Sequence, residues 1–270
     1  MPAIPEKILS LVQKPARYTG GELNSVVKDK NNIDLRFAFC FPDTYEIGMS
    51  HLGMKILYSL INSRENYWCE RVFAPDTDME AIMREKGIPL FALESRDALT
   101  DFDAIGFTLQ YELSYTNVLN MLNLANIPLR SNDRGDTLDI PVIVAGGPCV
   151  CNPEPLADFI DVFQIGEGEE MNNELLELLH EAKKNGWSKT DFLKKACQIG
   201  GVYVPSFYKP ILNADNTINR FEIYEDAPQR VTKRIIADLD NAPYPTNPIV
   251  PAGPSYTAVT VSKAWVDNND

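Results

Sequence analysis

The residues best placed to do chemistry lie in four short loops, and each loop follows a stretch of β-forming residues. The loops cover residues 43–48, 108–112, 146–152 and 166–169. Three of them contain glycine, which lets a ligand approach the backbone closely. One such loop alone is as easily explained as a turn into the next helix. Four together favour a ligand site, and we predict that all four line one shared cleft.

The kind of ligand is restricted by what the loops lack. Neither Gly-x-Gly-x-x-Gly nor a Lys-Ser/Thr pair follows the first strand, so the two common phosphate cradles are absent from the sequence. Glu167, Glu169 and Glu170 suit a helix N-terminus but would repel a phosphate. The loops therefore indicate a large, mostly neutral ligand.

Metal and acid–base sites are weaker alternatives. The chain has five cysteines, and Cys40, Cys149 and Cys151 could meet at one sheet edge. Cys-x-Cys is poor spacing for tetrahedral zinc and no histidine follows at ligand distance, so we predict buried apolar cysteines and no metal site. Three carboxylates could face the cleft as general acids, although helix capping explains them as well: Glu46, Glu112 and Glu154.

Strands and helices must alternate to bring these loops together. β-forming runs at 33–40, 71–73, 104–109, 141–145 and 160–165 alternate with helical patterns at 50–62, 76–86 and 114–125, and with a long helix after the 166–169 loop that ends near 184. This alternation predicts a doubly wound α/β fold, with a five-stranded parallel sheet in the flavodoxin-like order 2-1-3-4-5. Such sheets bind ligands beyond the C-terminal ends of their strands.

The 270 residues suggest one α/β domain with extensions. We expect a lead-in at 1–32, the α/β unit at 33–186, a helix, hairpin and proline-rich linker at 187–250, and a divergent tail at 251–270. The net charge of −13 argues against binding DNA or RNA. No apolar run is long enough for a membrane span, no signal peptide is evident, and the cysteine usage suggests the reducing cytoplasm.

Several runs, in order and with matching spacing, resemble the front half of a family of cobalamin-binding-domain radical S-adenosylmethionine proteins. In the first loop, Asp43-x-Tyr45-x-x-Gly48 has the frame of that family's Asp-x-His-x-x-Gly. Gly146-Gly147 matches its glycine pair. Thr108 stands where Ser-x-Leu begins, with Gln110 in place of the leucine. The longer matching runs are 15–22, 42–50, 106–112, 152–157 and 165–170.

The resemblance implies a cobalamin-binding-like domain. A protonated phenol with a pKa of about 10 is a poor cobalt ligand, so we expect Tyr45 or an apolar wall at the cobalt and no protein histidine there. His51, the only nearby histidine, is expected to be a surface or packing residue. The nucleotide tail would thread past the glycines. The residues implied to bind the cofactor are Asp43, Tyr45, Gly48, Thr108, Gln110, Gly146, Gly147, Pro148, Gly166 and Gly168.

The radical half of the resembled family is not found in this sequence. That family continues into a barrel whose Cys-x3-Cys-x2-Cys motif holds a 4Fe–4S cluster and S-adenosylmethionine. No three of the five cysteines here have that spacing, and the resemblance fades after Pro251. We expect this chain alone not to be catalytic and to serve a radical S-adenosylmethionine domain of a full-length parent. Two alternatives remain open: a flavin-binding module, and a docking domain that binds no corrinoid.

Overall fold

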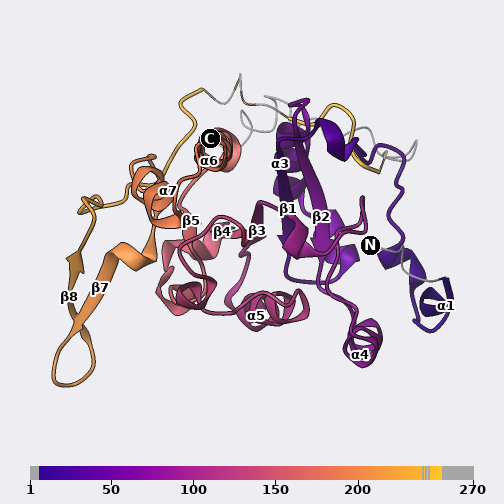
Figure 1. Cartoon of the computed structure of the whole chain (residues 1–270), viewed down its shortest axis with the longest axis horizontal. Coiled ribbons are helices and arrows are strands. Elements are labelled where there is room, and N and C mark those ends of the chain that lie inside the picture. The colour runs from indigo at the N-terminus through magenta and orange to yellow at the C-terminus, as the bar shows by residue number, and fades with distance from the viewer. Residues whose placement is uncertain (1–5, 239, 241, 243, 251–270) are drawn as a thin grey trace, which may run out of the picture.

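The computed structural model describes residues 6–238, 240, 242 and 244–250 (Figure 1). The predicted tail at 251–270 and the first five residues lie outside this range. The main sheet has six strands in the order β2-β1-β3-β4-β5-β6. A separate two-stranded hairpin follows it.

The first five strands confirm the predicted parallel sheet and its order. All four neighbouring pairs among them are parallel. Every residue of β2, β3 and β5 is buried, as expected where helices cover both faces. The five strands are β1 (Leu35–Phe41), β2 (Tyr67–Phe73), β3 (Ala104–Thr108), β4 (Val142–Gly146) and β5 (Val162–Gln164).

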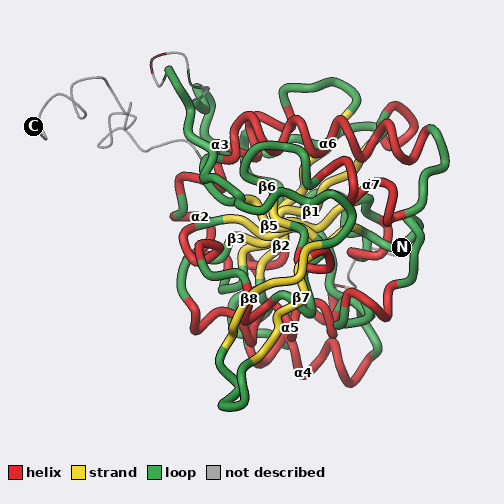
Figure 2. Tube along the Cα trace, turned by 90° about the vertical axis from the view of Figure 1, so that its left-hand side faces the viewer, coloured by secondary structure: helices red, strands yellow, loops and turns green. Residues whose placement is uncertain are grey.

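Helices cover both faces of the sheet (Figures 1 and 2). α3 (Leu52–Asn62) and α6 (Gly168–Lys184) lie on one face. α4 (Thr77–Lys86) and α5 (Tyr115–Leu124) lie on the other. α7 (Lys189–Ala196) packs beside α6, while α1 (Glu6–Leu9) belongs to the lead-in.

Two elements differ from the sequence-based prediction. The helix expected at 50–62 is α3, which begins at Leu52 because His51 is extended and caps it; the loop predicted before it also contains a short helix, α2 (Tyr45–Ser50). A sixth strand, β6 (Val202–Tyr203), pairs antiparallel with β5. The prediction ended the sheet at five strands because two residues form too short a run to be recognised.

The region after the sheet contains the predicted hairpin, formed by β7 (Tyr208–Leu212) and β8 (Ile218–Ile223). We call residues 226–238 and 244–250 the return segment. It pairs with the loop after β5 through the bridge between Gly166 and Arg234. Further on, the carbonyl of Ile249 accepts a hydrogen bond of 3.1 Å from the backbone N–H of Asn24. The segment therefore runs back across the molecule to the lead-in (Figure 1).

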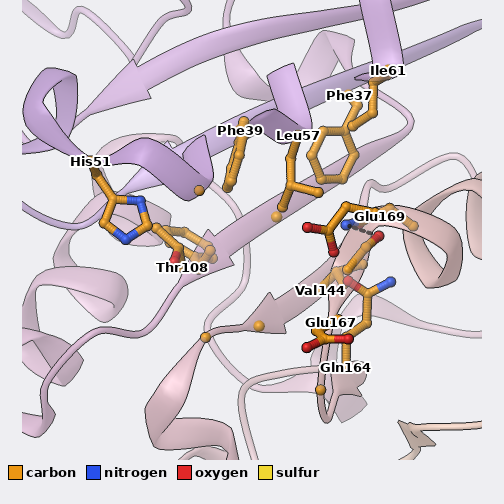
Figure 3. A pocket seen from close by; sticks show the side chains of 18 of the residues that line it. Phe37, Phe39, His51, Leu57, Ile61, Thr108, Val144, Gln164, Glu167 and Glu169 are labelled. Atoms are coloured by element: carbon orange, nitrogen blue, oxygen red, sulfur yellow. Dashed lines mark hydrogen bonds between the residues drawn. The ribbon is translucent and has the colours of Figure 1, made fainter. Parts of the chain in front are cut away.

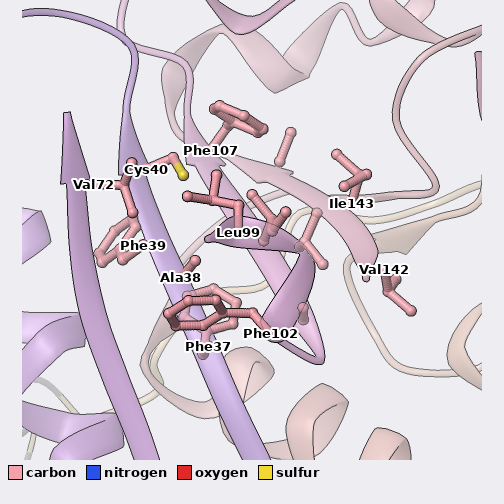
Figure 4. Packing of buried hydrophobic residues seen from close by; sticks show 14 of the residues in the cluster. Phe37, Ala38, Phe39, Cys40, Val72, Leu99, Phe102, Phe107, Val142 and Ile143 are labelled. Carbon is pink, nitrogen blue, oxygen red and sulfur yellow. The ribbon is translucent and has the colours of Figure 1, made fainter. Parts of the chain in front are cut away.

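Large apolar side chains fill the space around the central strands (Figure 4). Phe37 and Phe39 project from one face of β1, and their ring centroids are 6.1 Å apart. Leu99 and Phe102 come from the connection before β3, and Phe107 from β3 itself. Burial of apolar surface of this kind is the main stabilising contribution to the fold.

The outer side of β2 is bonded by groups that do not belong to a strand. The side-chain amide of Asn62 donates to the carbonyl of Cys69 and accepts from its N–H. Glu94 accepts from the N–H of Arg71 at 2.8 Å, and the N–H of Leu93 donates to the Arg71 carbonyl at 2.9 Å. The end of α3 and the chain before β3 thus complete this edge of the sheet.

Candidate functional site

A cavity of about 230 Å³ lies between the sheet and the helices α3 and α6, and extends to the C-terminal ends of the strands (Figure 3). Phe37 and Phe39 reach it from β1, and Leu57 and Ile61 reach it from α3. Its other lining residues lie at or beyond the ends of β3, β4 and β5, or at the starts of α3 and α6. They are His51, Gly53, Gly106, Phe107, Thr108, Gln110, Val144, Gly146, Gly147, Gln164, Gly166, Glu167, Gly168, Glu169 and Asn172.

The hollow results from small residues on one face of two paired strands. Gly106 is level with Val144, and Thr108 is level with Gly146. The ring of Phe37 occupies the space over Gly106, where a Cβ would lie 2.2 Å from Phe37 Cζ. Gly146 is different, because an added Cβ would meet nothing closer than 4.0 Å. The space at Gly146 is therefore open to the cavity.

One buried polar group in the cavity has no partner. Gln164, the last residue of β5, is only 5% exposed. Its amide nitrogen Nε2 has no hydrogen-bond partner among the residues that the structure describes. A buried donor left in this state costs about 1–3 kcal/mol. An unpaired buried donor of this kind is expected where a bound ligand supplies the missing acceptor.

A chain of hydrogen bonds crosses the cavity mouth. His51 Nδ1 accepts from the backbone N–H of Met54 at 3.1 Å. Gln110 bonds to the His51 side chain, and its Nε2 donates to Thr108 Oγ1 at 2.6 Å. Burial lowers the pKa of His51, and the bond to Gln110 only partly opposes that effect. The neutral ring with Nδ1 accepting must carry its proton on Nε2, so the imidazole offers no free lone pair to a metal.

The return segment pairs with the loop after β5, whose residues Gly166 and Glu167 line the cavity. The Arg234 carbonyl accepts from the N–H of Glu167 at 3.1 Å, and the Glu167 carboxylate accepts from the N–H of Ile236. Gly166 has φ +121°, and a Cβ there would lie 2.2 Å from the Arg234 oxygen. The loop after β5 therefore requires glycine because the chain itself passes over it. Arg234 also pairs with Glu170 on α6 at 2.8 Å.

The structure brings six of the ten predicted cofactor-binding residues to the cavity and leaves four outside it. Gly48 packs against β2, since a Cβ there would lie 2.3 Å from Phe73 Cε1. Asp43 accepts hydrogen bonds from the N–H of Thr44 and the hydroxyl of Tyr111. The six at the cavity are Thr108, Gln110, Gly146, Gly147, Gly166 and Gly168, and the four outside it are Asp43, Tyr45, Gly48 and Pro148.

Tyr45 faces the lead-in rather than the cavity. Its hydroxyl donates to Glu22 Oε1 at 2.7 Å, and its ring packs edge-on against Phe73 with centroids 5.3 Å apart. Burial, together with the Glu22 carboxylate, raises the pKa of Tyr45 to about 12. The loop at 43–48 follows β1 at the predicted edge of the sheet. Its residues are nevertheless not among those lining the cavity. His51, expected to be a surface or packing residue, lines the cavity instead.

The backbone conformation at position 147 requires glycine for a reason unrelated to the cavity. Its φ is +102°, and an added Cβ would lie 2.8 Å from the backbone oxygen of Leu109. The glycine pair after β4 therefore combines two roles. Gly147 permits the turn and the close approach to the loop after β3, whereas Gly146 leaves room in the cavity.

Two of the three cysteines, and all three candidate general acids, do not lie where the sequence predicted. Cys40 is buried as predicted, but Cys149 is half-buried and Cys151 is exposed. Within the described ranges, no three His, Cys, Asp or Glu side chains are grouped closely enough to hold a metal ion. Glu46 pairs with Arg17 at 2.8 Å, and Glu154 accepts from Tyr203. None of the three proposed acids lines the cavity.

Comparison with known proteins places this fold in a family. The model for the N-terminal region of radical SAM proteins matches residues 53–205, just over half of the chain, and the chain belongs to that family. An uncharacterized protein of Methanocaldococcus jannaschii, MJ0966, is 32% identical over 133 residues, which is 49% of this chain and 24% of the relative. The chain thus spans about a quarter of that relative's length.

No solved structure matches this chain. In the part of the chain that the structure describes, no helix has both the length and the hydropathy needed to cross a bilayer.

Proposed function

We propose that this chain is the corrinoid-binding N-terminal half of a radical S-adenosylmethionine enzyme, with the nucleotide tail of a cobalamin in the cavity. The observation that carries the proposal is the open space at Gly146 beside the unpartnered amide of Gln164, at the strand ends of a radical SAM N-terminal domain. Strand ends are where doubly wound sheets bind their ligands.

The size and lining of the cavity fit part of a large ligand. Whole small-molecule sites usually measure about 300–1,000 Å³, and this cavity has about 230 Å³. Phe37, Phe39, Leu57 and Val144 would enclose the apolar part of the tail, and Gln164 would bond its polar edge. This lining suits a nucleotide tail whose base lies in the cavity while the corrin ring stays outside it.

The surface around the cavity mouth suits the larger part of such a ligand. Ile47 lies in α2 and Leu52 at the start of α3, the helices that follow β1, and Tyr111 and Leu113 follow β3; all four have exposed apolar surface. Leu113 is 86% exposed. Exposed apolar residues grouped at one edge commonly mark an interaction surface. The corrin ring would lie here, next to the amide and hydroxyl groups of Gln110 and Thr108.

The hydrogen bonding of His51 argues that the protein places no imidazole nitrogen on the cobalt. Ring nitrogens that bind metals usually belong to a histidine whose other nitrogen donates a hydrogen bond. In His51 the other nitrogen accepts one, from Met54. A corrinoid, when bound, supplies a cobalt centre that can carry an organic group or an electron. The residues lining the cavity, with Gln110 and Thr108 at its mouth, would hold and orient it.

The radical chemistry would belong to another part of the parent protein. We propose that a radical S-adenosylmethionine domain there holds the 4Fe–4S cluster and S-adenosylmethionine. In this sequence no three cysteines have the Cys-x3-Cys-x2-Cys spacing of that cluster. The proposed partner of this chain is therefore that domain, and the corrinoid would be presented to it at the rim described above.

Visible absorption during titration with hydroxocobalamin, and separately with FMN, tests the proposal. We expect stoichiometric cobalamin binding, no retained FMN, and an electron paramagnetic resonance spectrum of the cob(II)alamin form without nitrogen coupling from the protein. Gly146→Val should weaken binding at least about tenfold by filling the cavity, whereas Gly200→Val, outside it, should not. Retention of FMN alone would support a flavin module, and binding of neither would support a docking domain.

A further inference from the structure

Gln164 has an environment unlike that of the other buried amides. Four buried side-chain polar atoms in the described part of the chain lack a partner, and only the Gln164 nitrogen belongs to a residue that lines the cavity. By contrast, the nitrogen of Asn172 donates to the Gly168 carbonyl at 2.9 Å, and that of Gln110 donates to Thr108. We infer that Gln164 is a specificity residue that bonds a ring nitrogen of the heterocyclic base ending the corrinoid's nucleotide tail.

The neighbours of Gln164 define the shape and polarity of its ligand. The cavity walls from β1, β4 and α3 are apolar, contributed by Phe37, Phe39, Val144, Leu57 and Ile61. A flat ring system can lie against such walls, because its faces carry no hydrogen-bonding groups. Its edge must still satisfy the amide at the end of β5. The amide can turn about its last bond, so it can present its nitrogen to an acceptor in the cavity.

The chemistry of the base supplies that acceptor. A benzimidazole or purine base that is not bound to cobalt has a ring nitrogen with a free lone pair, which accepts an N–H. A base attached through a phenol oxygen has no such nitrogen and would leave the Gln164 amide unpaired. Sites that bond a polar group discriminate strongly against analogues lacking it. Gln164 would therefore select nitrogen-containing bases, and this inference rests on the proposed corrinoid function.

The test compares cobalamin with cobinamide, which has the same corrin ring but no nucleotide base. Dissociation constants would be measured by absorption titration of the wild-type chain and of Gln164→Met, together with the melting temperature of each protein without ligand. Gln164→Leu serves as a second variant. Gln198→Met is the matched control, because this amide is exposed, lies outside the cavity and donates to the Asp226 carbonyl at 3.1 Å.

We expect the wild-type chain to bind cobalamin at least about tenfold more tightly than cobinamide. Gln164→Met should weaken cobalamin binding about tenfold and leave cobinamide binding unchanged. Its melting temperature without ligand should stay the same or rise, because the variant removes an unpaired donor. The control should change neither dissociation constant. A merely structural glutamine would instead lower the melting temperature when replaced.

Three results would overturn the inference. Equal affinity of the wild-type chain for cobalamin and cobinamide would show that the base is not bound here, although the corrinoid proposal would stand. Equal weakening of both ligands by Gln164→Met and Gln164→Leu, with lower melting temperatures, would show a structural role. Binding of neither corrinoid to the wild-type chain would refute this inference and the proposed function together.

Discussion

Two buried polar regions of this molecule differ in whether their hydrogen bonds are complete. At β2 the fully buried Arg71 side chain donates to Glu94 at 2.6 Å and to both carboxylate oxygens of Glu22 at 2.9 and 2.6 Å. At the end of β5 the nitrogen of Gln164 has no partner in the described structure. The Arg71 cluster ties the lead-in to the sheet. The unpaired Gln164 amide at the cavity is instead what is expected where a bound ligand supplies the acceptor.

The largest loss of stability should come from breaking the Arg71 cluster, whose hydrogen bonds are complete. Arg71→Met would leave Glu22 and Glu94 without their common partner, and we expect the free energy of unfolding to fall by about 3–5 kcal/mol. Urea denaturation followed by circular dichroism measures this. Arg130→Met, which removes an exposed pair with Asp158, should change it by less than about 1 kcal/mol. A loss at Arg71 no larger than at Arg130 would contradict this view of the cluster.

The two glycines after β4 allow the next test. Gly147→Val forces a side chain into a positive-φ turn and against Leu109, and should cost about 2–3 kcal/mol in unfolding free energy. Gly146→Val lies in a strand with open space above it and should cost nothing measurable. Thermal denaturation of both variants makes the comparison. Similar losses in the two would mean that the cavity at Gly146 is not open.

A smaller effect is expected at Tyr45. Tyr45→Phe removes the hydroxyl that donates to Glu22, so we expect a loss of about 1 kcal/mol in unfolding free energy. Because Tyr45 does not line the cavity, hydroxocobalamin affinity should stay within about twofold. Denaturation and absorption titration give the two values. A large loss of affinity with little loss of stability would place Tyr45 in the binding site.

The smallest effect concerns pH. The pKa of His51 is lowered in the folded protein, mainly by burial, so the unfolded chain binds more protons as the pH falls below about 6.5. The stability contributed by neutral His51 is present above this pH and is lost as the pH falls through the folded pKa. His51→Asn keeps a capping side chain but does not titrate. Its unfolding free energy should decline less than that of the wild-type chain between pH 7 and 5, and parallel declines would contradict the assignment.

The sequence was sufficient to predict the sheet but not the full length of β2. Runs such as 141–145 are apolar throughout, which is typical of strands buried on both faces. The prediction began this strand at Arg71, after the charged Glu70, although β2 begins at Tyr67 and Glu70 and Arg71 both lie within it. Both are buried because distant groups neutralise them, among them Glu22, Glu94 and Arg36.

At the site, the sequence located the glycines but not the reasons for them. Gly147 and Gly166 are required by the backbone of Leu109 and Arg234, and among the glycines that line the cavity only Gly146 leaves open space. The contact between Gly166 and Arg234 joins residues far apart in the chain, so no local pattern could reveal it. Gln164 lies within the strand predicted at 160–165, and nothing in the sequence singled it out. Its lack of a partner is a property of the folded chain alone.

The completed outer side of β2 has a consequence for solution behaviour. An unpaired edge strand is a template on which another chain can add a strand and begin aggregation. On β2, Asn62, Glu94 and Leu93 already bond the outward groups of Cys69 and Arg71. At the opposite edge β6 has only two residues, which is too short to recruit a neighbour securely. The main sheet is thereby protected at both edges against growing into an intermolecular one.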